Sequence, residues 1–500
     1  MKLAAMASSL ANGERAVVVF FISQIIFSAP FSLLHEALSL SILSFFALSV
    51  EISAEFSSES LAQFKSRAGA SSGILLGAVT LPGLMFSRLI QLLRAVSLHE
   101  IDSEELEYLR LQYWATSACC FGVLFFFYFI VPHLPNDNHS ISFHSDWSTK
   151  FSLSFIALYA AVFCVSFATK FHCGGYTAVM LLWVLCHGLA AVKLIQHVLH
   201  TFPACASIGE ALLVTTGLVI YFGDMLACTV VKINGYLASS EIVFVQYVIR
   251  RSEISTIIQG MLLGLLLFPM FLKFSLQVWE CCTSSAHVEH RAYHEIGRTV
   301  IFCALLAFIF ILIIPSWMQF VQDFPVHPWL WIVNFVFSEP LKRLSLCIYW
   351  VVVIYVSVLR FYNISKNSKI ERILLRKYYH LMAVSMFLPA LIFQSAFLEL
   401  AFGAALAIFL TLEIIRVWRI WPLGHLVHQF MNAFTDHRDS DLLIVSHFSL
   451  LLGFALPIWF SSGFDDRPLA PFAGILSLGI GDTMVRVLVV MSCHFKILAV

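Results

Sequence analysis

Residues 299–318 read TVIFCALLAFIFILIIPSWM, a run of 20 residues with no charged side chain. A helix of about 20 apolar residues crosses the hydrocarbon core of a bilayer. Similar runs recur along the 500-residue chain, which is 60% hydrophobic and only 12% charged. A soluble domain carries about twice that share of charged residues. Because the apolar runs are continuous rather than alternating, a transmembrane β-barrel is excluded. The sequence predicts an all-α, polytopic membrane protein.

The apolar runs predict about fourteen transmembrane helices. We place the apolar segments at 16–34, 37–52, 72–93, 114–131, 151–168, 175–195, 206–231, 257–274, 299–318, 329–337 (a short one), 344–359, 381–397, 398–415, 442–460 and 469–490. No loop between them is long enough to fold as a soluble domain. We expect residues 1–359 to form a multi-span membrane region that binds lipid or acts as a scaffold. Residues 360–500 are expected to carry the chemistry.

Basic residues indicate the orientation of the chain. Residues 360–377, RFYNISKNSKIERILLRK, carry six basic residues and one acidic residue. Short loops rich in Lys and Arg stay in the cytosol, so this loop is expected there. Arg416, Arg419 and Arg438 return to the same side after two further spans. The formal net charge is zero, so nucleic acid is not an expected partner. The twelve cysteines show no CxxC spacing that would indicate a metal or redox site.

The motif RKYYH, at the cytosolic entry of segment 381–397, is the first of four polar clusters in the last third of the chain. Arg376 and His380 are four residues apart and share one helical face, with Lys377 beside them. Two cations and a titratable imidazole suit an anionic ligand such as phosphate. The alternative is an ordinary basic flank of a membrane span.

The motif LEIIRVWRIWPLGH follows at the end of segment 398–415. Glu413 and Arg416 are three residues apart and can pair on a helix. Pro422 and Gly424 should then break that helix. A charge pair at the membrane boundary has a structural interpretation as well as a functional one.

The motif FTDHRDSD lies just before segment 442–460. Asp436, Asp439 and Asp441 fall within six residues, and His447 lies about one and a half turns inside the span. Clustered carboxylates are good ligands for Mg²⁺ and good general bases. A solvated loop is the alternative. The letters His437-Arg438-Asp439 imitate a protein-kinase catalytic loop, but the rest of that signature is missing.

The motif GIGDTM lies inside the last apolar segment, where Gly479 and Gly481 flank Asp482. An acid within a membrane span is costly and indicates a functional site, unless it pairs with a cation such as Arg486 four residues later. Small flanking residues let backbone or a phosphate approach closely. Together the four clusters supply cations, carboxylates and histidine on one membrane face. Phosphoryl transfer from a cytosolic nucleotide to a membrane lipid needs these groups.

These motifs resemble the dolichol kinase family, which is related to the polyprenol and phytol kinases and, more distantly, to the CDP-diacylglycerol synthases. The resemblance runs through RKYYHLMAVSMFLP, LEIIRVWRIWPLGH, FTDHRDSDLLIVSHFSLLLGFALPIW and AGILSLGIGDTM, over residues 376–484. It implies a multi-pass endoplasmic reticulum enzyme that phosphorylates dolichol with CTP and divalent metal, expected to be Mg²⁺, at the cytosolic face. The product, dolichyl phosphate, supports protein N-glycosylation.

The resemblance also implies roles for individual residues. Asp482 and Asp439 are expected at the metal, and either one could be the base. The other catalytic candidates are Asp436 and His447. The candidates for nucleotide contact are Gly479, Gly481, Arg376, Lys377, His380, Glu413 and Arg416. Family members continue after the GDT element with a basic loop similar to K-T-x-E-G-T, the expected CTP-binding segment. This chain continues with VRVLVVMSCHFKILAV instead, as in a truncated or frame-altered product. We therefore expect the chain as written to bind CTP poorly.

Three other functions are compatible with parts of the sequence. A transporter would suit the many spans, but the charges gather on one face and no inverted repeat is visible. A different lipid enzyme is the second alternative: a lipid cytidylyltransferase would use the same nucleotide and release pyrophosphate, and another polyprenol kinase would use a related alcohol. A catalytically inactive, truncated isoform is the third alternative. The sequence leaves the oligomeric state open.

Overall fold

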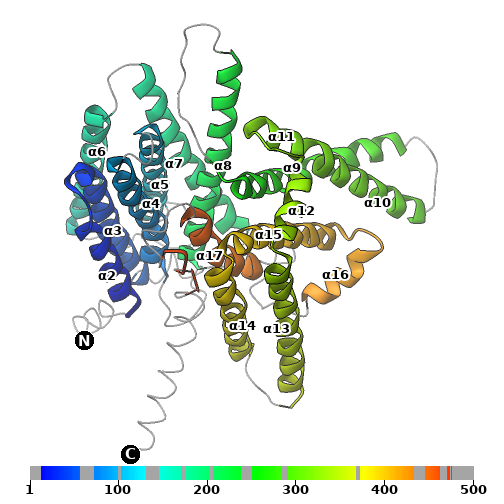
Figure 1. Ribbon diagram of the computed structural model, residues 1–500. Helices are drawn as coiled ribbons and strands as arrows, with labels where there is room; N and C mark the ends of the chain where they lie inside the picture. The colour runs from blue at the N-terminus through cyan, green and yellow to red at the C-terminus, as the bar shows by residue number, and fades with distance from the viewer. Residues whose placement is uncertain are drawn as a thin grey trace, which may run out of the picture. The chain divides into compact units, whose positions relative to one another are not determined.

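The structure is a computed structural model, and it describes residues 13–56, 72–98, 103–130, 146–170, 175–201, 207–237, 251–283, 291–367, 372–432, 445–461, 470–472 and 474–475 (Figure 1). Every regular element in these ranges is a helix, and no strand occurs within them. The all-α prediction is confirmed. The helices form two compact units, of which the first ends with the helix at Leu237 and the second begins with the helix at Glu253. The predicted functional division at residue 360 stays a prediction.

Within the described ranges, nine helices are long and apolar enough to cross a membrane, and five shorter apolar helices accompany them. Each of the first fourteen predicted segments overlaps one of these helices. The last segment, 469–490, lies almost entirely outside the described residues. The chain is therefore a multi-pass membrane protein, since lipid leaves a spanning backbone no partners except its own helix.

One predicted boundary is wrong. The sequence pattern placed a break at 397/398, but the helix ends at Phe393 and the next begins at Ser395. Gln394 between them has φ −149° and ψ 60°. Its side chain donates to Glu339 (3.1 Å) and accepts from Arg343 (3.4 Å). These tertiary contacts fix the turn at Gln394, and a hydropathy pattern does not contain them.

The first unit surrounds α5 (Ser103–Phe125), which continues as a π-helical turn, η3 (Phe126–Ile130). Its other helices are α2 (Gly13–Phe27), η1 (Phe31–Leu33), α3 (Leu34–Phe56), α4 (Ile74–Ser97), α6 (Asp146–Lys170), α7 (Gly175–Thr201) and α8 (Ile208–Leu237). Helix α5 packs against α3, α4, α7 and α8. Tyr113 and Trp114 of α5 are fully buried, and Trp114 meets the ring of Phe163 edge-on at 5.4 Å. This aromatic layer forms the core of the unit.

Helices α4 and α8 meet through bare backbone at their first turns. The Gly209 amide donates to the Ser72 carbonyl at 3.1 Å. A Cβ atom at Gly77 would lie only 2.4 Å from the Gly209 carbonyl oxygen. Gly73, just before α4, has φ +67°, which side chains disfavour. Glycine at these positions is therefore required by the crossing, because small residues let membrane helices approach closely.

Two buried ion pairs lie inside the first unit. Arg15 of α2 contacts Glu51 of α3 at 2.6 Å, and Glu51 also accepts the Leu75 amide at the start of α4 at 2.7 Å. Glu36 and Arg110 form a second buried pair at 2.9 Å. Unpaired charges would be costly in this environment, so these pairs fix which helix faces meet.

Asp224 of α8 also has partners. It accepts from the Tyr108 hydroxyl and from the Gln112 side chain, both on α5. The carboxylate thus ties α8 to the central helix of the unit.

At the start of α8, Glu210 accepts a hydrogen bond from the Ser207 amide at 2.9 Å, and the Ser207 hydroxyl accepts one from the Glu210 amide. This reciprocal arrangement is a capping box.

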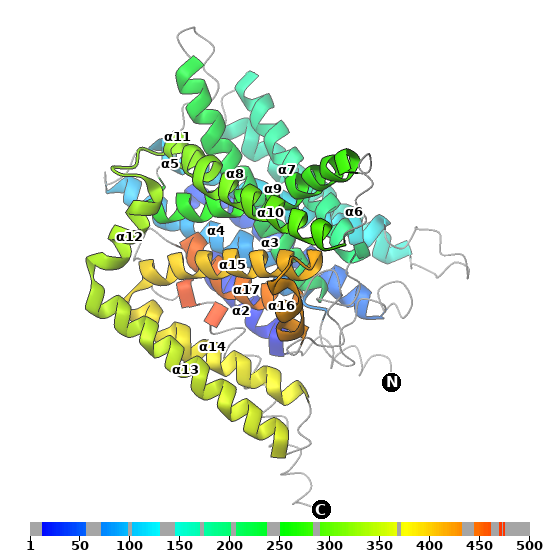
Figure 2. The same ribbon diagram turned by 90° about the vertical axis from the view of Figure 1, so that its right-hand side faces the viewer.

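The second unit contains the described parts of the motifs singled out in the sequence. Its helices are α9 (Glu253–Thr283), α10 (Arg291–Phe308), the π-helical turn η5 (Ile309–Ile313), α11 (Ile314–Val321), α12 (Pro328–Ser338), α13 (Pro340–Asn367), α14 (Arg372–Phe393), α15 (Ser395–Trp418), α16 (Leu423–Asn432), α17 (Val445–Ser461) and the short η6 (Ala470–Phe472). Helix α15 packs against α9, α14, α16 and α17. Figure 2 shows α13 and α14 side by side below α15.

Candidate functional site

Helices α14, α15 and α17 meet at three phenylalanine rings. The ring of Phe387 on α14 lies 4.7 Å from Phe402 on α15 and 5.7 Å from Phe454 on α17. Further along, the Trp459 indole of α17 donates to the Glu399 carbonyl of α15 at 3.3 Å. Phe454 lies at the level of Phe402, and Trp459, later in α17, lies at the level of Glu399, earlier in α15. The two helices are therefore antiparallel. The turn at Gln394 makes α14 and α15 antiparallel as well.

This arrangement brings His380, Glu413 and His447, one residue from each of three polar clusters, to one end of the helix group. His380 lies seven residues before Phe387, and His447 lies seven residues before Phe454. Glu413 lies eleven residues after Phe402. At a rise of about 1.5 Å per residue, these positions are about 10, 10 and 16 Å from the ring layer on the same side of it. The starts of α14 and α17 and the end of α15 therefore share one side of the unit.

The segment that leads to GIGDTM belongs to the same group. The turn η6 packs against α14 and α17. At Gly474, a Cβ atom would lie 2.3 Å from the Gly453 carbonyl oxygen of α17. The chain thus runs directly against the backbone of α17 shortly before it reaches the fourth cluster. Gly479, Gly481 and Asp482 themselves lie outside the described residues.

For the remaining candidate residues, the structure describes either nothing, the backbone alone, or the backbone and the side chain. Asp436, Asp439 and Asp441 also lie outside the described ranges. Arg376 and Lys377 lie in the first turns of α14, and His447 lies in the first turn of α17, but their side chains are not among the described ones. His380 is half buried on α14. The roles predicted for all these residues stay predictions.

Glu413 and Arg416 form the pair that their spacing predicted. The Arg416 guanidinium donates to both carboxylate oxygens of Glu413, at 2.6 Å and 2.9 Å. The side chains are only 4% and 2% exposed, respectively. Two parallel N–H···O bonds of this kind are strong and directional. Because Glu413 occupies this edge of the guanidinium, the pair fixes the last turn of α15, and the predicted nucleotide contact of Arg416 stays a prediction.

Helix α15 ends directly after this pair. Arg419 adopts the left-handed conformation, with φ 47° and ψ 49°, and its amide donates to the Arg416 carbonyl at 3.4 Å. The peptide bond between Trp421 and Pro422 is cis, and α16 begins at Leu423. The predicted break is present before Pro422, but Gly424 lies inside α16 and not in the break. The conformation of Arg419 was not foreseen, because no glycine or asparagine marks it in the sequence.

A second polar cluster of this unit was missed by sequence reasoning. Glu339 pairs with Lys342 at 2.9 Å and accepts the Gln394 amide. Arg343 is buried and lies 4.0 Å over the ring of Phe335. The Lys342 ammonium, through its hydrogen bond and its charge, lowers the pKa of Glu339 from its usual value. The signal was the charged run between segments 329–337 and 344–359. This cluster ties the α12–α13 turn to the α14–α15 turn, at the opposite end of α14 from His380.

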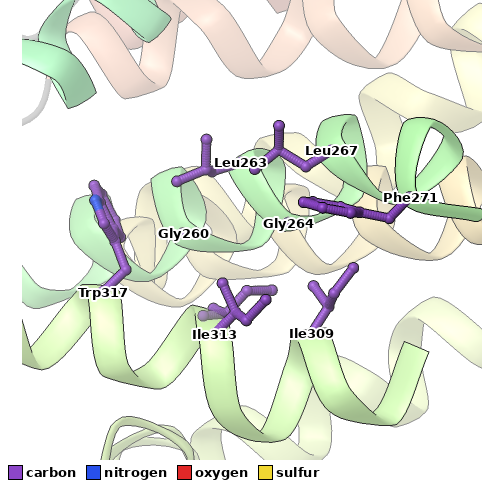
Figure 3. Close-up of a pocket in the computed structure, with 9 residues that line it drawn as sticks. Gly260, Leu263, Gly264, Leu267, Phe271, Ile309, Ile313 and Trp317 are labelled. Atoms are coloured by element: carbon purple, nitrogen blue, oxygen red, sulfur yellow. The ribbon is translucent and has the colours of Figure 1, made fainter. Parts of the chain in front are cut away.

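A narrow apolar groove lies between α9 and the continuous element formed by η5 and α11 (Figure 3). Gly260 and Gly264 form its floor on α9, and Ile309, Ile313 and Trp317 face them. The lining is almost entirely hydrocarbon, so the groove offers no cation to a phosphate. Within the described ranges, no three His, Cys, Asp or Glu side chains are grouped to hold a metal ion. The predicted metal ligands Asp439 and Asp482 lie outside those ranges.

Comparison with known proteins places the chain in a family. A family model described as dolichol kinase matches residues 177–453, more than half of the chain. A dolichol kinase of Arabidopsis thaliana, EVAN, is 58% identical over 478 residues, which cover 96% of this chain and 84% of that relative. The chain belongs to the dolichol kinase family. The resemblance inferred from the motifs is confirmed, and so is the expectation of an enzyme of this kind.

More distant members of the family match shorter parts. The dolichol kinase of Homo sapiens is 29% identical over 317 residues, which cover 60% of this chain and 53% of the relative. Dolichol kinase sec59 of Schizosaccharomyces pombe is 33% identical over 202 residues, 37% of this chain and 39% of the relative. No solved structure matches the chain. The matched range 177–453 contains the first three polar clusters and ends before the fourth.

Proposed function

We propose that this chain transfers the γ-phosphoryl group of CTP to the hydroxyl of dolichol, at the cytosolic face of the endoplasmic reticulum membrane. Membership of the dolichol kinase family supports the lipid substrate. The observation that carries the proposal is the shared side of the second unit on which α14 and α17 begin and α15 ends, because these three ends bear most of the chemistry-bearing motifs. The basic loop at 360–377, next to that side, supports a cytosolic active face.

The proposed reaction needs charge stabilisation and one proton acceptor. The dolichol oxygen attacks the γ-phosphorus, the bond to the β-phosphate oxygen breaks, and CDP leaves with that electron pair. The hydroxyl proton passes to a carboxylate, for which Asp439 and Asp482 are the candidates. Arg376, Lys377 and His380 would contact phosphate oxygens from the first turns of α14. Such positioned charges supply most of the catalysis in phosphoryl transfer.

A divalent metal, expected to be Mg²⁺, would be held by carboxylates of Asp439 and Asp482. Oxygen ligands of this type suit Mg²⁺, which keeps several waters and binds phosphates. Bound there, the ion would neutralise charge on the phosphates. Glu413 and Arg416 would act differently, since their mutual hydrogen bonds hold the end of α15 rigid beside the phosphate-binding groups.

The location in the endoplasmic reticulum and the supply of dolichyl phosphate for protein N-glycosylation are part of the proposal. The apolar helices support a membrane substrate that never leaves the bilayer. A protein with this arrangement would bring the soluble nucleotide to the membrane surface, where the lipid hydroxyl lies.

The experiment is phosphate transfer by membranes that contain only the 500-residue chain and added dolichol. CTP labelled at the γ-phosphate should give labelled dolichyl phosphate, and CTP labelled at the α-phosphate should not. Label from the α-phosphate in the lipid would indicate a cytidylyltransferase and contradict the proposal. No lipid labelling from either nucleotide would also contradict it for this chain.

A further inference from the structure

Helix α16 has an apolar stripe that the rest of the second unit does not cover. Its sequence is LGHLVHQFMN. Leu423 is 53% exposed and Leu426 is 64% exposed, whereas Met431 is 5% exposed and Gly424 is buried. The helix is therefore anchored along one side and leaves two leucines outside. This pattern is not explained by packing within the unit.

The residues of α16 fall on three different faces of the helix: an apolar face, a buried face and a polar face. With about 100° between successive residues, Leu423, Leu426 and Val427 lie on one face. Gly424 and Met431, the buried positions, lie about a quarter turn from the centre of that face. The polar residues His425, His428, Gln429 and Asn432 lie opposite the apolar face. The helix thus touches the protein with its flank and presents one apolar and one polar face to two different surroundings.

The apolar face of α16 follows directly after a candidate membrane span. That span is α15, and Val417 near its end is 36% exposed. Beyond its end, Trp421 is 57% exposed, and the exposed leucines of α16 follow. Arg419 beside Trp421 is also exposed. Tryptophan and a cation at the end of a span are typical of the membrane–water interface.

The turn between the two helices is held by hydrogen bonds. The Gly424 amide donates to the Ile420 carbonyl at 2.6 Å, and the Thr299 hydroxyl of α10 donates to the Trp421 carbonyl at 2.9 Å. Figure 2 shows α16 turned across the end of α15 instead of continuing it. A helix turned in this way at the end of a span lies along the bilayer surface.

We propose that α16 is an interfacial helix that lies in the headgroup layer of the leaflet where α15 ends. Leu423 and Leu426 enter the acyl boundary, and His425 and Gln429 face water. Trp421 lies at headgroup level, and Arg419 contacts lipid phosphate. This inference does not depend on the proposed reaction. It adds that the chain after Asn432, which bears Asp436 and Asp439, starts from the level of the lipid headgroups.

Lipid is the occupant that the observations favour over a protein partner. The exposed leucines form a narrow strip on a ten-residue helix, directly after the end of the candidate span α15. A stable protein interface needs a much larger area, of about 800 Å² on each partner. An amphipathic helix beside a membrane needs only its own apolar face.

The test uses the photoreactive residue benzoylphenylalanine in the full chain, reconstituted in vesicles of phosphatidylcholine and phosphatidylserine. It replaces Leu426 in one variant, His425 in a matched variant on the polar face, and Ile408 in a third variant as the control for contact with lipid. After illumination, mass spectrometry measures the fraction of chain carrying a phospholipid adduct. The variant at Leu426 should form several-fold more lipid adduct than the variant at His425, and about as much as the variant at Ile408.

Equal adduct at positions 425 and 426 would overturn the proposal, and so would a protein adduct instead of a lipid adduct at 426. If the variant at Leu426 does not fold, as judged by gel filtration, the same comparison is made at Leu423. Absence of lipid adduct at either leucine, with adduct present at Ile408, would place α16 away from the bilayer and overturn the proposal.

Discussion

The Arg416 side chain binds both carboxylate oxygens of Glu413 at the last turn of α15, and both residues are almost completely buried. The pair stands directly before the left-handed Arg419 that ends the helix. It therefore lies between a membrane span and the interfacial helix α16. Its spacing of three residues makes it local, but its burial depends on the helices packed around α15.

The first prediction concerns the stability that this pair provides. Glu413→Gln leaves the Arg416 charge buried without its carboxylate, and removing one partner of a buried ion pair costs about 3–5 kcal/mol. The unfolding midpoint of the detergent-solubilised chain should fall clearly. Lys342→Gln is the matched control, because the Glu339–Lys342 pair is exposed and solvent screens such pairs so that they contribute little to stability. Equal losses in the two variants would contradict the structural role of the Glu413–Arg416 pair.

A double substitution distinguishes a structural role of the Glu413–Arg416 pair from a role in phosphate transfer. Glu413→Leu combined with Arg416→Met replaces a buried pair by apolar side chains, which is often neutral or stabilising. The double variant should unfold near the temperature of the parent chain. Dolichol phosphorylation that survives in it would limit the pair to a structural role. Loss of phosphorylation in a folded double variant would support the predicted contact with the nucleotide.

The second prediction concerns the crossing of α4 and α8. Gly77→Ala adds a methyl group 2.4 Å from the Gly209 carbonyl oxygen, and this obstacle is backbone rather than a mobile side chain. Overpacking of this kind costs about 1–3 kcal/mol. Gly235→Ala, also in a helix of the first unit, meets nothing within 4 Å and should be neutral or slightly stabilising. Thermal unfolding of both variants measures the difference, and equal stability would show that the helices do not approach this closely.

The third prediction concerns pH and the Glu339 cluster. The hydrogen bond and charge of Lys342 lower the pKa of Glu339 from its usual value of 4.5 in the folded protein. A carboxyl group with a lowered folded pKa stabilises the fold above its unfolded pKa, and this contribution is lost as pH falls through the folded pKa. The unfolding midpoint should therefore decrease below pH 4.5 by less in Glu339→Gln than in the parent chain. Identical acid dependence of the two chains would contradict this prediction.

The fourth prediction concerns the proposed metal ligands. Asp482→Asn and Asp439→Asn remove carboxylates expected at the metal, so each should reduce phosphate transfer by about 100-fold or more while membrane insertion is unchanged. The measurement is labelled dolichyl phosphate formed from γ-labelled CTP by membranes with equal amounts of each variant. Glu107→Gln is the control, since Glu107 is exposed on α5 in the other unit and should leave the rate unchanged. Full activity of Asp482→Asn would move the metal site to the Asp436–Asp441 cluster.

The sequence predicted the features of the candidate site that lie within one helix. It did not predict how the helices meet to form the site. The Glu413–Arg416 pair and the break near Pro422 follow from spacing along one helix, and both are present. The meeting of Phe387, Phe402 and Phe454, which puts the polar clusters on one side, joins residues up to 67 positions apart. No periodicity in a single segment contains that contact. The turn at Gln394 was misplaced for the same reason, because its partners are Glu339 and Arg343.

The sequence by itself determined the membrane class, the positions of the apolar helices and the family. A bilayer imposes its constraint on each segment separately, so about 20 apolar residues are sufficient to predict a helix. The tertiary structure alone decided which helices are neighbours: α5 at the centre of the first unit, α4 against α8 through glycine, and α14, α15 and α17 around their rings. Apolar side chains gain no hydrophobic energy by leaving lipid for one another. Close packing, paired charges and long-range hydrogen bonds therefore select the arrangement, and none of these can be read from one segment alone.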